Sequence, residues 1–72
     1  MSKISEKTQQ KVALNIFTLR EKLELSQSEV AELAGIDRKT VNRIENERFS
    51  PNIDTLTRIS VALRVRVSDL LI

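Results

Sequence analysis

Four polar side chains share one face of a short helical stretch in the middle of the chain. They are Lys39, Asn42, Arg43 and Asn46. Their intervals of three, one and three residues place them on one side of a helix that turns about 100° per residue. The stripe has no acidic and no large apolar residue, and Arg38 stands beside it. Arginine and lysine donate to guanine O6 and N7, and asparagine bonds adenine N6 and N7. The stripe therefore has the chemistry of a surface that reads base-pair edges.

A second interpretation of the same stripe stays open at this point. Any amphipathic helix needs a polar outer face in water, so the stripe can be an ordinary solvated surface. Such a surface usually mixes glutamate with lysine, and this one does not. The net charge of +2 and the sequence pI of about 9.4 prompt a search for a nucleic-acid surface but do not show one.

The residue types that the chain lacks exclude most catalytic chemistry. It contains no Cys and no His. Zinc sites built on thiolates and imidazoles, and acid–base catalysis by histidine, are therefore excluded. There is no Gly-rich phosphate-binding loop either. We expect no enzyme activity, no metal, no cofactor and no small-molecule ligand.

Length and composition indicate one globular domain over residues 1–72, with residues 1–5 frayed. Of the 72 residues, 40% are hydrophobic and 31% are charged. No apolar run approaches the roughly 20 residues of a membrane-spanning helix, and the N-terminus has no signal-peptide core. We therefore expect a soluble cytoplasmic protein. A chain this short buries only about 60% of its unfolded surface, so its stability is marginal or shared with a partner.

The elements that must position the stripe are predicted to be helices. One Gly, one Pro and no alternating β-branched run indicate an all-α fold. We predict five helices, near 6–23, 27–34, 38–46, 53–63 and from about 68. The second and third are joined by Gly35-Ile36-Asp37, which has the spacing of a helix-turn-helix.

Short local motifs predict where these helices begin. Ser26-Gln27-Ser28-Glu29 is a capping box, flanked by Leu25 and Val30 as a hydrophobic staple. Gly35 stands where the second helix needs a left-handed residue. The other predicted N-caps are Asp37, Asn52 and Ser68.

Apolar residues at helical spacing predict the core. The predicted core residues are Val12, Ile16, Leu19, Leu23, Val30, Leu33, Ala34, Val41, Ile44, Leu56, Ile59, Leu63 and Leu70. Leu14 and Val61 lie off these stripes and Phe17 lies at the edge of the first, as scattered surface residues or as a partner surface. Glu45 falls toward the core side of the third helix, and Arg20 lies at the edge of the first apolar stripe. Because a partly buried glutamate needs a cation, we predict an Arg20–Glu45 salt bridge. The alternative is two exposed, unrelated charges.

The residues from Leu25 to Asn46 resemble the Cro/phage-repressor-like (XRE-type) helix-turn-helix family. The resemblance covers about residues 12–72. It rests on the Ser26-Gln27 opening, on Ala31 and Gly35, on the Ile44-Glu45-Asn46 end of the third helix, and on Pro51 to Leu56. Glu24, Glu47 and Arg64 stand where many relatives have Gly, so these helix ends are left-handed or wound differently.

The resemblance implies a compact five-helix, lambda-repressor-like domain that acts as a transcriptional repressor or autoregulator, and as a candidate activator. It implies a homodimer on a two-fold-symmetric operator in double-stranded DNA, with the third helix in the major groove. Within the family, the Asp37-Arg38 pair resembles the restriction–modification controller proteins, and small phage repressors are equally compatible in size. The implied base-reading residues are Arg38, Lys39, Asn42 and Arg43. The implied phosphate contacts are Gln27, Asn46, Arg48 and Ser50, and the resemblance implies that Gln27 also supports base contacts. A buried Arg20–Glu45 pair also agrees with several members.

A dimer requires an apolar surface away from the DNA-binding face. Our first choice is the surface of the last helix and its flanks, formed by Val65, Val67, Leu71 and Ile72. The patch of Leu14 and Phe17 is the second choice. RNA polymerase is a candidate further partner. The alternative function is an antitoxin-like or scaffold module of the same fold that binds protein, against which the acid-free stripe argues.

Overall fold

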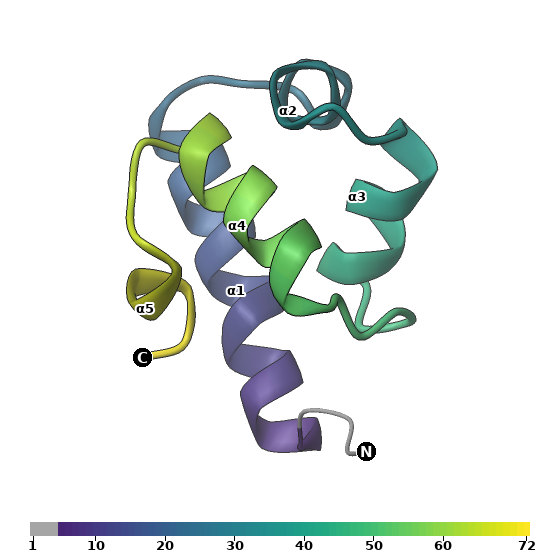
Figure 1. Cartoon of the computed structure of the whole chain (residues 1–72), viewed down its shortest axis with the longest axis vertical. Helices are drawn as coiled ribbons and strands as arrows, with labels where there is room; N and C mark the ends of the chain where they lie inside the picture. Colours follow the sequence, from purple (N-terminus) through teal and green to yellow (C-terminus); the bar gives the residue numbers. More distant parts are fainter. Residues whose placement is uncertain (1–4) are drawn as a thin grey trace.

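The computed structural model describes residues 5–72, and all regular structure in that range is helical (Figure 1). The helices are α1 (Glu6–Lys22), α2 (Gln27–Ala34), α3 (Arg38–Glu45), α4 (Ile53–Ala62) and α5 (Val67–Leu70). The predicted all-α fold with a helix-turn-helix at α2 and α3 is confirmed. None of the described helices is long and apolar enough to cross a membrane. Of the segment 1–5 that was predicted to be frayed, residues 1–4 lie outside the described residues, and Ser5 is the N-cap of α1.

Side-chain caps begin the first four helices. In the capping box of α2, Glu29 N–H donates to Ser26 Oγ over 3.0 Å, and Ser26 N–H donates to Glu29 Oε1 over 2.8 Å. Ser5, Asp37 and Asn52 each accept a hydrogen bond from the backbone N–H three residues on. These bonds satisfy donors that the first turn of a helix leaves unpaired. The predicted caps at Asp37 and Asn52 are confirmed.

The start of α5 corrects one prediction. Arg66, rather than Ser68, occupies the N-cap position, and Ser68 lies within the helix. The carboxylate of Asp69 accepts a hydrogen bond from Arg66 N–H over 2.9 Å. The N–H of Asp69, from which a short polar cap side chain would accept, donates to the backbone carbonyl of Arg66 over 2.9 Å.

The chain turns through left-handed residues at the ends of four helices. Gly35 has φ 71°, as predicted, and the non-glycine residues Glu24, Glu47 and Arg64 have φ 58°, 60° and 62°. A left-handed conformation costs a non-glycine residue about 1–2 kcal/mol. In each turn the next N–H reaches back to a helix carbonyl, as from Arg48 to Arg43 over 2.7 Å. Such bonds satisfy terminal carbonyls and offset part of the strain.

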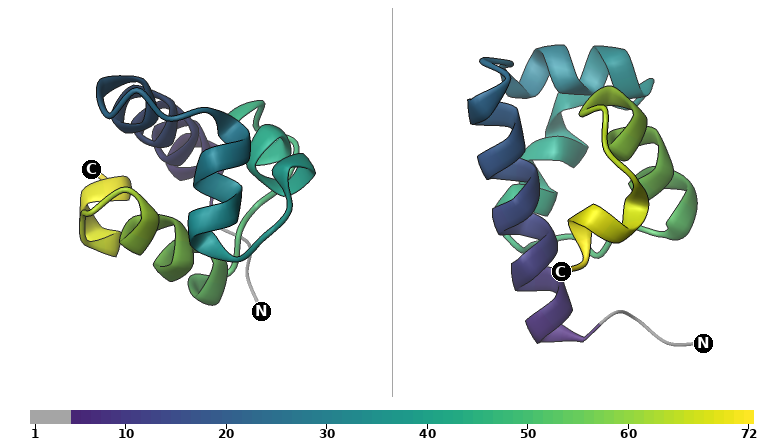
Figure 2. Two further views of the ribbon diagram at one scale, coloured as in Figure 1. Left: turned by 90° about the horizontal axis from the view of Figure 1, so that it is seen from above. Right: turned by 90° about the vertical axis from the view of Figure 1, so that its left-hand side faces the viewer.

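The helices enclose one apolar core. α2 packs against α3 and α4, α1 packs against α3 and α5, and α4 packs against α5 (Figure 2). Most of the predicted core positions are buried, Leu70 among them. Leu33 is an error of the prediction, because it is 60% exposed. Val30, Ala31 and Ala34 face the core, and Leu33 lies about 100° of helical rotation away from the centre of that face. Leu23, at the C-cap of α1, is also partly exposed.

The C-terminal residues lie beside α1 and are hydrogen-bonded to it (Figure 2). Asn15 Nδ2 donates to the carbonyl oxygens of Leu70 and Ile72 over 3.0 and 2.9 Å. The last three residues are therefore held against the first helix by hydrogen bonds as well as by the burial of Leu70.

Candidate nucleic-acid interface

Helix α3 presents its polar stripe to solvent and its apolar side chains to the core. Val41 and Ile44 are 0% and 1% exposed. All four predicted base-reading residues are exposed: Arg38, Lys39, Asn42 and Arg43. The structure therefore brings these side chains together on one outward face of α3. Helix α3 lies on the side of the domain opposite α5 (Figure 1).

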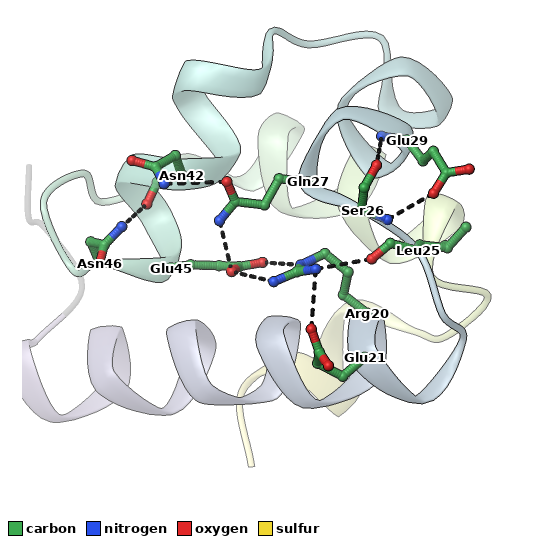
Figure 3. Close-up of polar contacts among 9 residues, drawn as sticks. All are labelled: Arg20, Glu21, Leu25, Ser26, Gln27, Glu29, Asn42, Glu45 and Asn46. Carbon is green, nitrogen blue, oxygen red and sulfur yellow. Dashed lines mark hydrogen bonds and ion pairs between the residues drawn. The ribbon is translucent and has the colours of Figure 1, made fainter.

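The predicted phosphate-contacting residues lie around that face. Asn46 is the C-cap of α3, and its Nδ2 donates to the carbonyl of Asn42 over 2.8 Å. Arg48 is exposed and Ser50 is half-buried in the segment that joins α3 to α4. Gln27 is half-buried at the first position of α2, beside α3 (Figure 3). All four residues remain predictions as contacts with DNA.

A buried ion pair fixes α3 against α1. Arg20 Nε lies 2.7 Å from Glu45 Oε2, and Arg20 Nη2 donates to Glu45 Oε1 over 3.0 Å. The two side chains are only 10% and 6% exposed. The pair that the helical facing of Arg20 and Glu45 predicts is thus present in the bidentate geometry that favours arginine over lysine.

The guanidinium of Arg20 has further partners. Its Nη1 donates to the carbonyl of Leu25 over 2.9 Å, and its central carbon lies 5.4 Å from the centre of the Phe17 ring. The hydrogen bond to Glu45 raises the pKa of Arg20, and this effect exceeds the opposing effect of burial. Arg20 therefore joins α1, α3 and the loop before α2 at one point.

The sequence did not reveal how Gln27 continues this network. Its Nε2 donates to Glu45 Oε1 over 3.0 Å, and its Oε1 accepts from Asn42 Nδ2 over 3.2 Å (Figure 3). The side chain that we expected at a phosphate therefore contacts the buried pair and Asn42, which is a predicted base-reading residue. No spacing in the sequence signals these bonds, because the partners come from different helices.

A cleft lies between α1 and α3 next to the stripe. Its volume is about 520 Å³, and its lining includes Leu14, Phe17, Gln27, Asn42 and Glu45. The exposed apolar residues of α1 therefore lie beside the polar network and on the same side of the domain as Asn42.

The N-terminal end of α3 carries one carboxylate among the cations. Asp37 accepts the cap hydrogen bond from Thr40 N–H over 2.8 Å. Hydrogen bonds with the side chain and backbone of Thr40, together with the charges of Lys39 and Arg43, hold the pKa of Asp37 below its usual value. The cap is therefore charged at neutral pH.

Comparisons with known proteins agree with the helix-turn-helix fold. The model of the helix-turn-helix family HTH_3 matches residues 16–70. A hypothetical transcription factor from Neisseria, NHTF, has a similar structure with a TM-score of 0.88 and 26% identity, over 100% of this chain and 84% of that one. The restriction-modification controller protein C.AhdI from Aeromonas hydrophila has a TM-score of 0.83 and 26% identity, over 86% of this chain and 94% of that one.

A third similar structure is a larger protein. An HTH_3 family transcriptional regulator from Vibrio cholerae has a TM-score of 0.85 and 28% identity, over 90% of this chain but only 36% of that one. No curated protein sequence matches the chain significantly. The family match spans most of the chain, and the resemblance to XRE-type proteins is confirmed. The chain therefore belongs to the helix-turn-helix family HTH_3, a family of DNA-binding transcriptional regulators.

Proposed function

We propose that this protein binds double-stranded DNA sequence-specifically and regulates transcription as a homodimer on a two-fold-symmetric operator. The observation that carries the proposal is the exposed, acid-free stripe on α3, the second helix of the helix-turn-helix. This helix is fixed by a buried bidentate ion pair, so its outward side chains are presented in a defined orientation.

The contacts divide into two kinds. Those to phosphate set the register of the protein on the duplex, and those to base edges specify the sequence. We assign the first role to Gln27, Asn46, Arg48 and Ser50, and the second to Arg38, Lys39, Asn42 and Arg43. A dimer then places two copies of α3 in successive major grooves, about 34 Å apart.

The regulatory role that we favour is repression or autoregulation. The likeness to the restriction-modification controller protein C.AhdI supports a regulatory role in general. Activation through contact with RNA polymerase, and a cytoplasmic location, are parts of the same proposal. The alternative function is an antitoxin-like or scaffold module that binds protein. A measurement of DNA binding distinguishes this module from a DNA-binding regulator.

The decisive experiment is selection of bound duplexes from a random pool at two salt concentrations. A two-fold-symmetric consensus with half-sites one helical turn apart is expected, with affinity that falls as salt rises because bound phosphates release counterions. A bound pool with no consensus would indicate an architectural DNA-binding protein. Absence of retention at low salt would favour the protein-binding alternative.

Replacing one base-reading residue tests the assignment of α3. Arg43→Ala should weaken operator binding by about 1–3 kcal/mol and relax the preference at one base pair. Lys22→Ala removes one positive charge from an exposed position of α1 and should leave that preference intact. If Arg43→Ala retains every preference of the wild type, Arg43 does not read a base.

A further inference from the structure

Two of the left-handed turns carry a glutamate, and they lie in different parts of the domain. Glu24 follows α1 with φ 58°, and Glu47 follows α3 with φ 60°. Both residues are exposed. Within residues 5–72 neither carboxylate forms a salt bridge, so each charge faces solvent without a cation bound to it.

The fold itself does not need a carboxylate after α3. The turn is held by backbone bonds, from Glu47 N–H to the Ile44 carbonyl over 3.0 Å and from Arg48 N–H to the Arg43 carbonyl over 2.7 Å. Glycine would make the same bonds without the strain of a left-handed side chain. The helix dipole also opposes a negative charge at the C-terminal end of a helix. Strain that the fold does not require is a reason to look for a function in the side chain.

Glu47 lies among the side chains that we assign to DNA phosphates. It stands between Asn46 and Arg48, and it lines the cleft that Asn42 also lines. In a helix-turn-helix, the N-terminal residues of the second helix contact base edges. The C-terminal end of α3 is therefore the end that faces the DNA backbone. A carboxylate held there meets phosphates that carry the same sign of charge.

We propose that Glu47 is an affinity-limiting residue, whose carboxylate repels the phosphates that Asn46 and Arg48 contact. This inference rests on the proposed function. Because contacts with the phosphate backbone carry no sequence information, the repulsion weakens binding to every duplex by the same factor. The base preferences of α3 are unchanged, while more protein is needed to occupy the operator. In a protein that regulates its own synthesis, Glu47 thus raises the concentration at which the operator fills.

The experiment separates the charge of Glu47 from its backbone strain. Kd is measured for the selected operator, for one half-site and for a scrambled duplex, at several salt concentrations. Glu47→Gln should bind the half-site roughly 5-fold more tightly at low salt, the effect of one pair of like charges about 4 Å apart in water. The gain should be roughly 25-fold at the full operator, where two copies bind. The scrambled duplex should gain by the same factor as a duplex of equal length that carries the operator.

The salt dependence gives a second measurement of the same charge. Glu47→Gln should steepen the slope of log K against log salt by about one at the half-site, because one more phosphate charge is neutralised without opposition. The gain in affinity should therefore shrink as salt rises, since salt screens exposed charges.

Urea unfolding shows whether stability explains the gain. Glu47→Gln keeps the left-handed side chain and should leave the urea midpoint nearly unchanged. Glu47→Gly removes both the charge and the strain, so it should bind DNA as tightly as Glu47→Gln and also raise the midpoint. A gain in affinity that appears in both variants follows the charge and not the stability.

Glu24 provides the matched control, because it has the same side chain, the same left-handed backbone and a place at the end of a different helix. It does not line the cleft beside Asn42. Glu24→Gly should raise the urea midpoint as Glu47→Gly does. Glu24→Gln changes the net charge by the same amount as Glu47→Gln, yet it should leave every Kd within about 2-fold of the wild type, since its charge is far from the phosphates and screened.

Three results would overturn the proposal while leaving the proposed function intact. One is an unchanged Kd in Glu47→Gln, which would place the carboxylate away from phosphate. Another is an equal gain in Glu24→Gln, which would assign the effect to net charge alone. The third is a lost preference at one base pair in Glu47→Gln, which would make Glu47 a base-reading residue that accepts from cytosine N4. A wild-type protein that binds no duplex at low salt would overturn the proposed function, and this inference with it.

Discussion

The side chains of Arg20 and Glu45 are 10% and 6% exposed, and the loss of Glu45 leaves Arg20 only the longer, 3.5 Å contact with the exposed carboxylate of Glu21. Glu45→Ala should therefore destabilise the domain by about 3–5 kcal/mol. That is a large share of the total stability expected for a small domain. The free energy of unfolding, measured in urea, checks this expectation.

An exposed ion pair provides the control. Arg58 and Asp54 form a pair on α4 with a 2.9 Å contact, and their side chains are 51% and 70% exposed. Arg58→Ala should cost less than about 1 kcal/mol, because water screens the pair. If Glu45→Ala and Arg58→Ala lower the free energy of unfolding by the same amount, burial does not strengthen the Arg20–Glu45 pair.

Sequence reasoning reached the ion pair but not the amide chain that continues from it. The facing of Arg20 and Glu45 follows from the helical period within α1 and within α3. The bonds of Gln27 depend on the angle between α2 and α3, which no local pattern encodes. The residue types of the stripe could therefore be predicted, but the way in which one of them is oriented could not.

At the scale of the element, α3 depends on its N-cap. Asp37→Ala should lower the urea midpoint, because the hydrogen bond to Thr40 N–H is lost. The loss should be smaller than in Glu45→Ala, since the site is exposed to water. The matched variant Asp37→Asn keeps a good capping group without a titrating charge.

The cap also predicts a dependence on pH. Since the pKa of Asp37 is lower in the folded chain, its charge adds stability above the unfolded pKa of about 3.9. That contribution is lost as pH falls through the lower, folded value. The wild type should thus lose stability relative to Asp37→Asn on acidification below about pH 4. If the difference in unfolding free energy between the wild type and Asp37→Asn stays constant from pH 7 to pH 2, the charge of Asp37 does not stabilise the fold.

Helix boundaries were predictable where a short motif encodes them. Ser26, Asp37 and Asn52 cap as expected because each lies three residues before the N–H that it accepts from. At α5 the motif at Ser68 predicts a start two residues too late, because the N-cap is Arg66, whose N–H donates to Asp69. Leu33 was misplaced because eight residues of α2 give few apolar positions from which to define a face.

At the scale of the whole molecule, the distribution of exposed apolar side chains bears on how two copies would meet. Val65, Val67 and Leu71 pack against the core and are half-buried, whereas Ile72 is 79% exposed. Leu14, on the competing α1 patch, is 63% exposed and lies in the cleft beside Asn42. A second copy bound there would cover part of the face that we assign to DNA. The α5 surface lies on the opposite side from α3, which favours it for the dimer (Figure 1).

Ile72→Asp and Leu14→Asp distinguish these two surfaces. Both side chains are mostly exposed, so either variant should fold as the wild type does. We expect Ile72→Asp to sediment as a monomer and to lose roughly 10²- to 10⁴-fold in affinity for a full operator, since two linked half-sites no longer act together. Its affinity for an isolated half-site should not change. Leu14→Asp should remain a dimer in sedimentation equilibrium. If Leu14→Asp alone is monomeric, the dimer interface lies on α1 instead. In that case the second copy of the protein would fill the cleft beside Asn42 while α3 binds DNA.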